Sequence, residues 1–246
     1  MSKTSQITLR YFNCRGRAQA LRDVLLDAGL PFNDELVEVG AKWPAQKQDK
    51  DFSGPFGSLP LLIWGNDRVA QTLAIASYLS RRLGHYDGRD AQAIAQLEMI
   101  ASAAYLDLLL AAGEMRWQVG LAKDEATWNA WFDGYVQRAR LRIPYFEQLL
   151  ASADSQFFGD NHPAAADFFV YEAISEWQET LGPSLLDELS CPRLARFAET
   201  IGSRPSLSAY RNAGRRPVAF SGSPTDADAL KRLQAAAKIR SGRAPG

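Results

Sequence analysis

Hydrophobic and polar positions follow two periods along this chain, and the change falls near Gly84. Before it, apolar and polar residues alternate over short stretches such as Ile7–Phe12, which is the period of a β-strand. Stretches with a helical period lie between them. The other elements predicted here are strands at 31–39, 59–64 and 68–70 and helices at 15–28 and 72–83, with 43–51 irregular. This order predicts a small α/β domain with a mixed four-stranded sheet over residues 1–84.

After Gly84 the alternation stops and only helical periods remain. Residues 85–90 are predicted to form a linker, and residues 91–216 an all-helical domain. The helices expected in it lie at about 91–117 and 125–151, after Pro163, and at 184–189 and 192–201.

The last residues, 217–246, form a C-terminal tail. It is predicted to be irregular up to Pro224 and helical over 225–240, with acidic residues in the first turn and basic residues in the last. We expect this helix to pack on the body of the protein, and a frayed terminus is the alternative.

Composition narrows the class of protein. Hydrophobic residues make up 46% and charged residues 23%, and the formal net charge is +0, so nothing drives binding to nucleic acid or to an anionic membrane. No apolar run approaches the roughly 20 residues of a spanning helix, and the polar stretch Met1–Gln6 has no secretory signal, so we expect a cytoplasmic protein. Two cysteines and two histidines give no disulfide framework and no metal-ligand spacing, so no metal is expected.

Candidate chemistry lies at the ends of the predicted strands. Pro60 interrupts a short apolar strand, which predicts an edge, a bend or a cis bond that turns the Leu59 backbone outward. That backbone could then pair with a peptide-like ligand. Gln71 and Thr72 begin a helix, where a carboxylate can bind. With the Tyr11 hydroxyl, these features predict a pocket for a short acidic peptide that carries a reactive group.

Several short stretches together resemble the cytosolic glutathione transferases, most closely their tyrosine-type sigma class, which includes glutathione-dependent prostaglandin D synthases. They are Tyr11-Phe12-Asn13 with Arg15-Gly16-Arg17-Ala18, Trp43-Pro44 with Lys47, Pro55-Phe56-Gly57 with Leu59-Pro60, and Gln71 to Ala76 with Tyr78-Leu79. Their order and spacing match over the first 84 residues, and the resemblance extends over about 215 residues, leaving the tail without a counterpart.

The resemblance implies a glutathione transferase with a thioredoxin-like first domain that binds glutathione as co-substrate. The helical domain would wall the site of a small hydrophobic electrophile, and a cytoplasmic homodimer active in detoxification is implied. The resemblance also implies a role for each site residue. Tyr11, supported by Arg17, would donate its hydroxyl to the glutathione sulfur, and Trp43 and Lys47 would hold the glycine carboxylate. The backbone of Leu59, before cis Pro60, would pair with the cysteinyl backbone, and Gln71 and Thr72 would bind the γ-glutamyl carboxylate.

Three residues depart from the family pattern. Thr72 replaces a serine and keeps the hydroxyl. Ala164 replaces a helix-capping Ser or Thr three residues before Asp167, which removes a cap worth about 1 kcal/mol, and the helix is expected to begin differently. Ser102 stands where an aspartate often reaches the glutathione amine of the neighbouring subunit, and Asp107 lies about one and a half turns away.

Two alternatives stay open. The chain could be a glutathione-binding carrier or regulator with little turnover. It could also be a thiol–disulfide reductase acting through Cys14, near a helix start that can lower a thiol pKa, although a non-catalytic cysteine is the preferred interpretation. The residues predicted to face the electrophile are Phe12, Tyr105, Met115 and Trp117.

Overall fold

The described part of the chain comprises two regions of different architecture. In the computed structural model, residues 6–84, 86–121, 124–153, 155–159, 161–223 and 225–240 are described. Residues 1–5, on which the location prediction partly depends, lie outside that part, as do residue 85 of the predicted linker and residues 241–246 of the tail.

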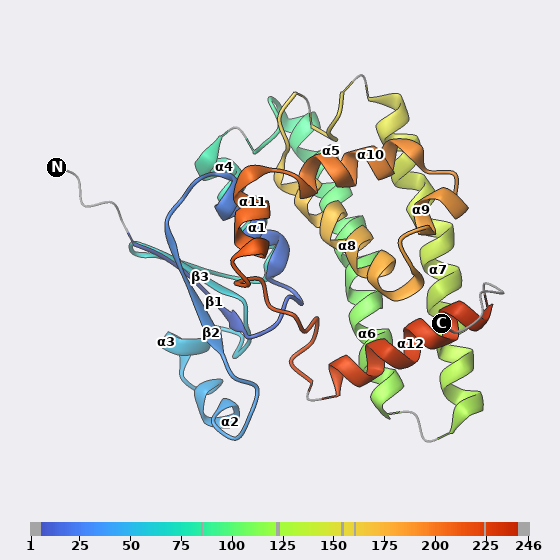
Figure 1. The fold of residues 1–246 in the computed structure, drawn as a ribbon. Coiled ribbons are helices and arrows are strands. Elements are labelled where there is room, and N and C mark those ends of the chain that lie inside the picture. Colours follow the sequence, from blue (N-terminus) through green and yellow to red (C-terminus); the bar gives the residue numbers. More distant parts are fainter. Residues whose placement is uncertain are drawn as a thin grey trace.

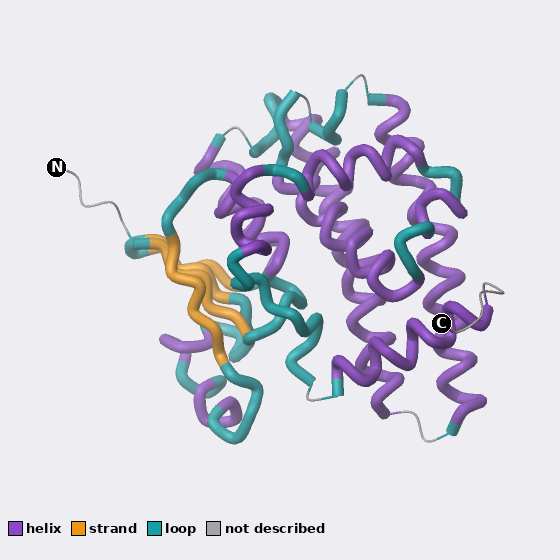
Figure 2. Tube along the Cα trace, viewed as in Figure 1, coloured by secondary structure: helices purple, strands orange, loops and turns teal. Residues whose placement is uncertain are grey.

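The first region is built on a mixed four-stranded sheet, as predicted. The strands are β1 (Ile7–Phe12), β2 (Phe32–Val37), β3 (Leu61–Trp64) and β4 (Asp67–Ala70), in the spatial order β2-β1-β3-β4. Figure 2 shows this sheet in orange beside the helices. Strand β1 runs parallel to β2 and antiparallel to β3, and β3 pairs antiparallel with β4. Alternate residues of β1 are buried, so the period of its sequence directs one face into the core.

Helices cover this sheet and connect its strands. Helix α1 (Gln19–Asp27) begins four residues later than predicted, because the residues before it form a loop. Helix α4 (Thr72–Leu83) has the predicted bounds. The prediction of an irregular segment at 43–51 is wrong, because α2 (Trp43–Gln46) and α3 (Lys50–Ser53) form there. Proline in the first turn of α2 and the Asp49 cap of α3 are the local signals that favour these short helices.

The second region consists of helices (Figure 1). Helices α5 (Ala91–Ala103) and α6 (Leu110–Leu121) are joined by a π-helical segment, η1 (Ala104–Leu109), into one long element. The others are α7 (Glu125–Ser152), α8 (Ala165–Leu181), α9 (Leu185–Glu188), α10 (Pro192–Gly202) and α11 (Pro205–Asn212). Sequence periodicity missed α11. Helix α8 lies at the centre of this region and Trp177 on it is fully buried, donating its indole N–H to the Leu108 carbonyl of η1 at 3.1 Å.

Helix α8 begins at Ala165 with Ala164 as its N-cap, so the expectation of a different start is wrong. The missing hydroxyl is compensated in part by Asp167. Its carboxylate accepts the N–H of Ala164 at 2.8 Å and that of Phe158 at 3.0 Å, which ties the preceding loop to the helix.

The prediction that no apolar run is long enough to span a membrane needs correction. By length and composition, the helix Ala91–Gln118 qualifies, with a mean hydropathy of 1.5 over its most apolar window. In this fold 39% of that window is buried, where η1 packs against α8 and α6 against α7. A core helix has the same apolar composition as a spanning one.

The described part of the tail includes helix α12 (Asp226–Arg240), which packs on α6 and α8 (Figure 1). Leu233 is fully buried there, and Arg240 pairs with Asp133 of α7 at 2.6 Å. The prediction of a packed tail helix is therefore confirmed.

Candidate functional site

The register of the sheet brings three predicted site segments to one end. Leu61 of β3 pairs with Arg10 of β1 and with Ala70 of β4. The next residue of β1 is Tyr11, the residues before Leu61 are Leu59 and Pro60, and the residue after Ala70 is Gln71. These segments therefore meet at the same edge. The bond between Leu59 and Pro60 is cis, which is one of the three alternatives that the sequence pattern left open and the one that the family resemblance implied.

The Tyr11 side chain is buried at this edge. Its hydroxyl accepts the backbone N–H of Arg17 at 3.1 Å. Burial is the main cause that raises the pKa of Tyr11 above its ordinary value, and the nearby Cys14 raises it further. The hydroxyl is therefore protonated at neutral pH and can donate a hydrogen bond. The arginine side chain itself is exposed.

The Thr72 hydroxyl is occupied by contacts within the protein. It donates to the Arg17 carbonyl at 3.1 Å and accepts from the Tyr105 hydroxyl at 3.2 Å. Its one proton is thus committed, which differs from the role implied by the resemblance. The first intrahelical bond of α4 runs from Ile75 N–H to Gln71, so the first-turn N–H groups have no acceptor within the helix. Gln71 has φ of 74°, a left-handed conformation uncommon outside glycine.

The predicted glycine-carboxylate residues lie to one side. Trp43 packs edge-on against Phe12, the neighbour of Tyr11, with ring centroids 4.9 Å apart. Lys47 follows α2 and has an exposed side chain. The structure thus connects Trp43 to the tyrosine through one aromatic contact and leaves the lysine at the surface.

A cleft of about 380 Å³ opens beside Tyr11. Of the residues predicted to face an electrophile, Phe12 lines it. Met115 is fully buried, Trp117 is half exposed, and Tyr105 bonds to Thr72, so these three predictions are not supported. The other wall residues are Cys14, Gly16, Arg17, Leu109, Leu110, Gly113, Glu114, Phe220, Ser221 and Gly222. The last three belong to the tail, and the sequence carried no signal that would bring them here.

Cys14 lies beside Tyr11 and is buried. Burial raises the pKa of its thiol to about 11, although Arg22 nearby lowers it somewhat. At pH 7 a thiol with that pKa is about 0.01% thiolate. The reactive form needed for thiol–disulfide exchange is therefore scarce.

We expect Cys14→Ala protein to keep its glutathione-dependent activity within roughly two-fold, because a buried neutral thiol contributes packing rather than charge. In the wild type, alkylation of Cys14 should be slow at pH 7 and rise about ten-fold per pH unit up to its pKa. Mass spectrometry of a pH series on Cys191→Ser protein would isolate this thiol. Rapid labelling at neutral pH would contradict its buried neutral state.

Among the described residues, no group of three or more His, Cys, Asp or Glu side chains could hold a metal ion.

Comparison with known proteins identifies the architecture. The glutathione S-transferase N-terminal domain model matches residues 7–81, and the glutathione S-transferase C-terminal domain model matches residues 133–214. Mouse "Glutathione S-transferase A4" is 30% identical over 212 residues, covering 85% of this chain and 90% of the relative. The chain therefore belongs to the glutathione S-transferase family. It is a cytosolic-type glutathione transferase with a thioredoxin-like first domain.

Solved structures agree with that fold. The glutathione S-transferase of Ascaris lumbricoides superposes with a TM-score of 0.71 at 25% identity, covering 85% of this chain and 97% of the other. The structure described as rat hPGDS complexed with a quinoline superposes at 0.69 and 23% identity, covering 88% and 100%. The second family-model match ends at residue 214, just before the tail.

Proposed function

We propose that this glutathione transferase uses Tyr11 to hold the thiol of bound glutathione as a thiolate for attack on a small hydrophobic electrophile. The observation that carries the proposal is the Tyr11 hydroxyl. It is held by the Arg17 N–H at 3.1 Å, and Tyr11 lines the mainly apolar cleft of about 380 Å³. An acceptor bond to an N–H polarises the hydroxyl and strengthens it as a donor.

Glutathione would lie along the edge where β1, β3 and β4 meet. The Leu59 backbone before cis Pro60 would pair with the cysteinyl peptide. The γ-glutamyl carboxylate would take the first-turn N–H groups at Gln71 and Thr72, since the threonine hydroxyl already donates to Arg17. Trp43 and Lys47 would hold the glycine carboxylate.

Recognition of the glutathione amine is the least defined contact. Ser102 replaces the aspartate of the family pattern. Asp107 lies 3.9 Å from Arg142 of its own chain, so its charge is already partly balanced. We propose that neither reproduces the usual amine contact.

Thiolate formation explains only part of the expected rate. Lowering the pKa of a thiol from about 8.5 by two units requires roughly 2.7 kcal/mol and raises the thiolate fraction about 25-fold at pH 7. Nucleophilicity falls with pKa, which removes roughly 6–10-fold of that gain. Most acceleration must come from positioning the electrophile, so the walls of the cleft determine which substrate is used.

Calorimetric titration with glutathione, combined with conjugation and glutathione-peroxidase assays, tests the proposal. A transferase binds glutathione and turns over aromatic or unsaturated electrophiles. Binding without turnover across such a panel would favour a carrier or regulator. Disulfide reduction that is lost in Cys14→Ala protein would favour the reductase alternative.

A homodimer is part of the proposal, and Phe56 is its predicted anchor. The side chain is 67% exposed on the loop before Pro60, an unusual position for a phenylalanine unless a partner covers it. We expect Phe56→Ala to weaken dimerisation by roughly 2 kcal/mol, about 30-fold in dissociation constant. Sedimentation analysis across a concentration series measures this. The exposed Leu141 serves as a control, and equal effects of Leu141→Ala would remove Phe56 from the role.

The division into residues 1–84, 91–216 and 217–246 remains a prediction. The cytoplasmic location is also a prediction.

A further inference from the structure

The tail lies directly against the loop between β1 and α1. The Ala219 carbonyl accepts the N–H of Arg15 at 2.9 Å, and the Phe220 carbonyl accepts the N–H of Gly16 at 2.8 Å. Gly16 has φ of 36°, and the next N–H along the chain, that of Arg17, is the one donated to the Tyr11 hydroxyl. Two consecutive tail carbonyls therefore hold the turn that presents this N–H.

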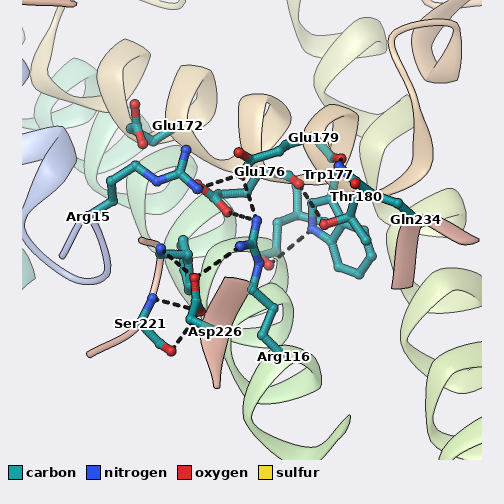
Figure 3. Close-up of polar contacts among 12 residues, drawn as sticks. Arg15, Arg116, Glu172, Glu176, Trp177, Glu179, Thr180, Ser221, Asp226 and Gln234 are labelled. Carbon is teal, nitrogen blue, oxygen red and sulfur yellow. Dashed lines mark hydrogen bonds and ion pairs between the residues drawn. The ribbon is translucent and has the colours of Figure 1, made fainter. Parts of the chain in front are cut away.

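One carboxylate holds that part of the tail in place. Asp226, at the start of α12, accepts the N–H groups of Phe220 and Ser221, each at 3.0 Å, and the Ser221 hydroxyl at 2.7 Å (Figure 3). The same side chain faces Arg116 of α6 at 3.4 Å. Phe220 thus links helix α12 to the loop between β1 and α1, since its N–H donates to Asp226 and its carbonyl accepts from Gly16.

The Phe220 ring packs against helix α6. It is buried, and the Arg116 guanidinium lies 5.3 Å from its centroid. A Cβ at Gly113 would lie only 2.5 Å from its Cε1, so the absence of a side chain at Gly113 lets the ring approach α6. The connection to the loop therefore has one well-defined position.

Three further ion pairs with α8 belong to the same network. Arg216, before the tail segment, donates to both carboxylate oxygens of Glu172 on α8 at 2.7 and 2.9 Å. Arg15, in the loop between β1 and α1, and Arg116 each lie 2.9 Å from Glu176 of α8 (Figure 3). The tail and the loop between β1 and α1 are thus fixed to the same helix.

We propose that Asp226 is a positioning residue for the Tyr11 hydroxyl: it holds Phe220 and Ser221, whose segment holds the turn at Arg15 and Gly16, which aims the Arg17 N–H at that hydroxyl. The proposal rests on the proposed function of Tyr11. It makes the tail part of thiol activation as well as a wall of the cleft. If this carboxylate is removed, the turn loosens, the hydroxyl loses its fixed N–H partner, and its hydrogen bond to a bound thiolate weakens.

The test is Asp226→Asn with Asp228→Asn as a matched control, because Asp228 carries the same charge on the same helix and its side chain is 85% exposed. In Asp226→Asn, amide hydrogen exchange at Arg15 and Gly16 should accelerate about ten-fold or more. The pKa of bound glutathione, followed by thiolate absorbance, should rise by roughly half to one unit. Asp228→Asn should change neither quantity.

Each outcome decides the proposal. Unchanged exchange at Gly16 would show that Asp226 does not hold the turn. Faster exchange with an unchanged thiol titration would show that Asp226 has a structural role alone. Either of these two results would overturn the proposal. Should Asp226→Asn fail to fold, Ser221→Ala removes one of the carboxylate's bonds and should shift both quantities in the same direction by less; no shift would also overturn it. Titration of Tyr11→Phe in parallel distinguishes the role of Tyr11 from the role of Asp226. If Tyr11→Phe shifts the pKa of the bound thiol and Asp226→Asn does not, only the inference about Asp226 fails.

Discussion

Replacing Tyr11 by phenylalanine should lower glutathione conjugation about 10- to 100-fold at neutral pH, because one hydrogen bond to the thiolate is lost. The change removes one oxygen and little volume. Glutathione affinity should change little, since the peptide contacts proposed at Leu59 and Gln71 do not involve this hydroxyl. The pKa of the bound thiol should rise towards its solution value of about 8.5.

The pH dependence follows from the direction of that shift. Where the wild type already holds a thiolate, the variant still holds a thiol, so the deficit is largest near neutral pH. It should shrink as the pH approaches the pKa of free glutathione, where the thiol ionises without help. An unchanged thiolate titration in Tyr11→Phe would contradict the role and direct attention to Arg17 and Cys14. Cys14→Ala is the matched control beside the same cleft.

Much of the first domain could be predicted because its signals are local. Alternation in Ile7–Phe12 predicted the strand that carries Tyr11 near its end, and a proline in a short apolar strand restricted Pro60 to an edge, a bend or the cis bond that is observed. The order of the elements predicted a mixed sheet, whereas the spatial order β2-β1-β3-β4 comes from the structure. Class membership also followed, since short motifs at fixed spacing resemble one family.

Contacts between segments far apart in the sequence could not be predicted from local patterns. Sequence spacing suggested a free hydroxyl at Thr72, but that hydroxyl bonds to Arg17 and Tyr105, 55 and 33 residues away. The irregular segment before α12 has no periodicity, and its contact with Gly16 spans more than 200 residues. Its place is fixed by buried charges whose partners lie on other helices.

The largest effect on stability is expected at Arg116, which is 1% exposed. Its guanidinium lies 2.9 Å from Glu176, 2.6 Å from Glu179 and 3.4 Å from Asp226 (Figure 3). Arg116→Met keeps most of the side-chain length and removes the charge, which leaves buried carboxylates with too few cations. Breaking such a network costs about 3–5 kcal/mol of unfolding free energy. For a chain of this size that corresponds to a fall in Tm of roughly 6–20 °C.

The deficit should depend on pH. Burial raises the pKa of Glu176 to about 7, against the influence of Arg15 and Arg116, so the loss of one arginine raises it further. A carboxyl whose pKa is higher in the folded than in the unfolded state binds a proton on folding. Its contribution to stability is therefore largest below its unfolded pKa and is lost as the pH rises through the folded value. The deficit of Arg116→Met should accordingly be larger at pH 8 than at pH 6.

Urea denaturation at the two pH values measures this, with Arg240→Met as the control. Arg240 pairs with Asp133 in the same part of the fold, but both side chains are partly exposed, so its loss should cost at most about 1 kcal/mol. Adding Glu176→Gln to Arg116→Met should recover part of the deficit and flatten its pH dependence, because the amide removes the unpaired charge. If Arg116→Met is as stable as the control variant at pH 8, the buried charges do not depend on this arginine.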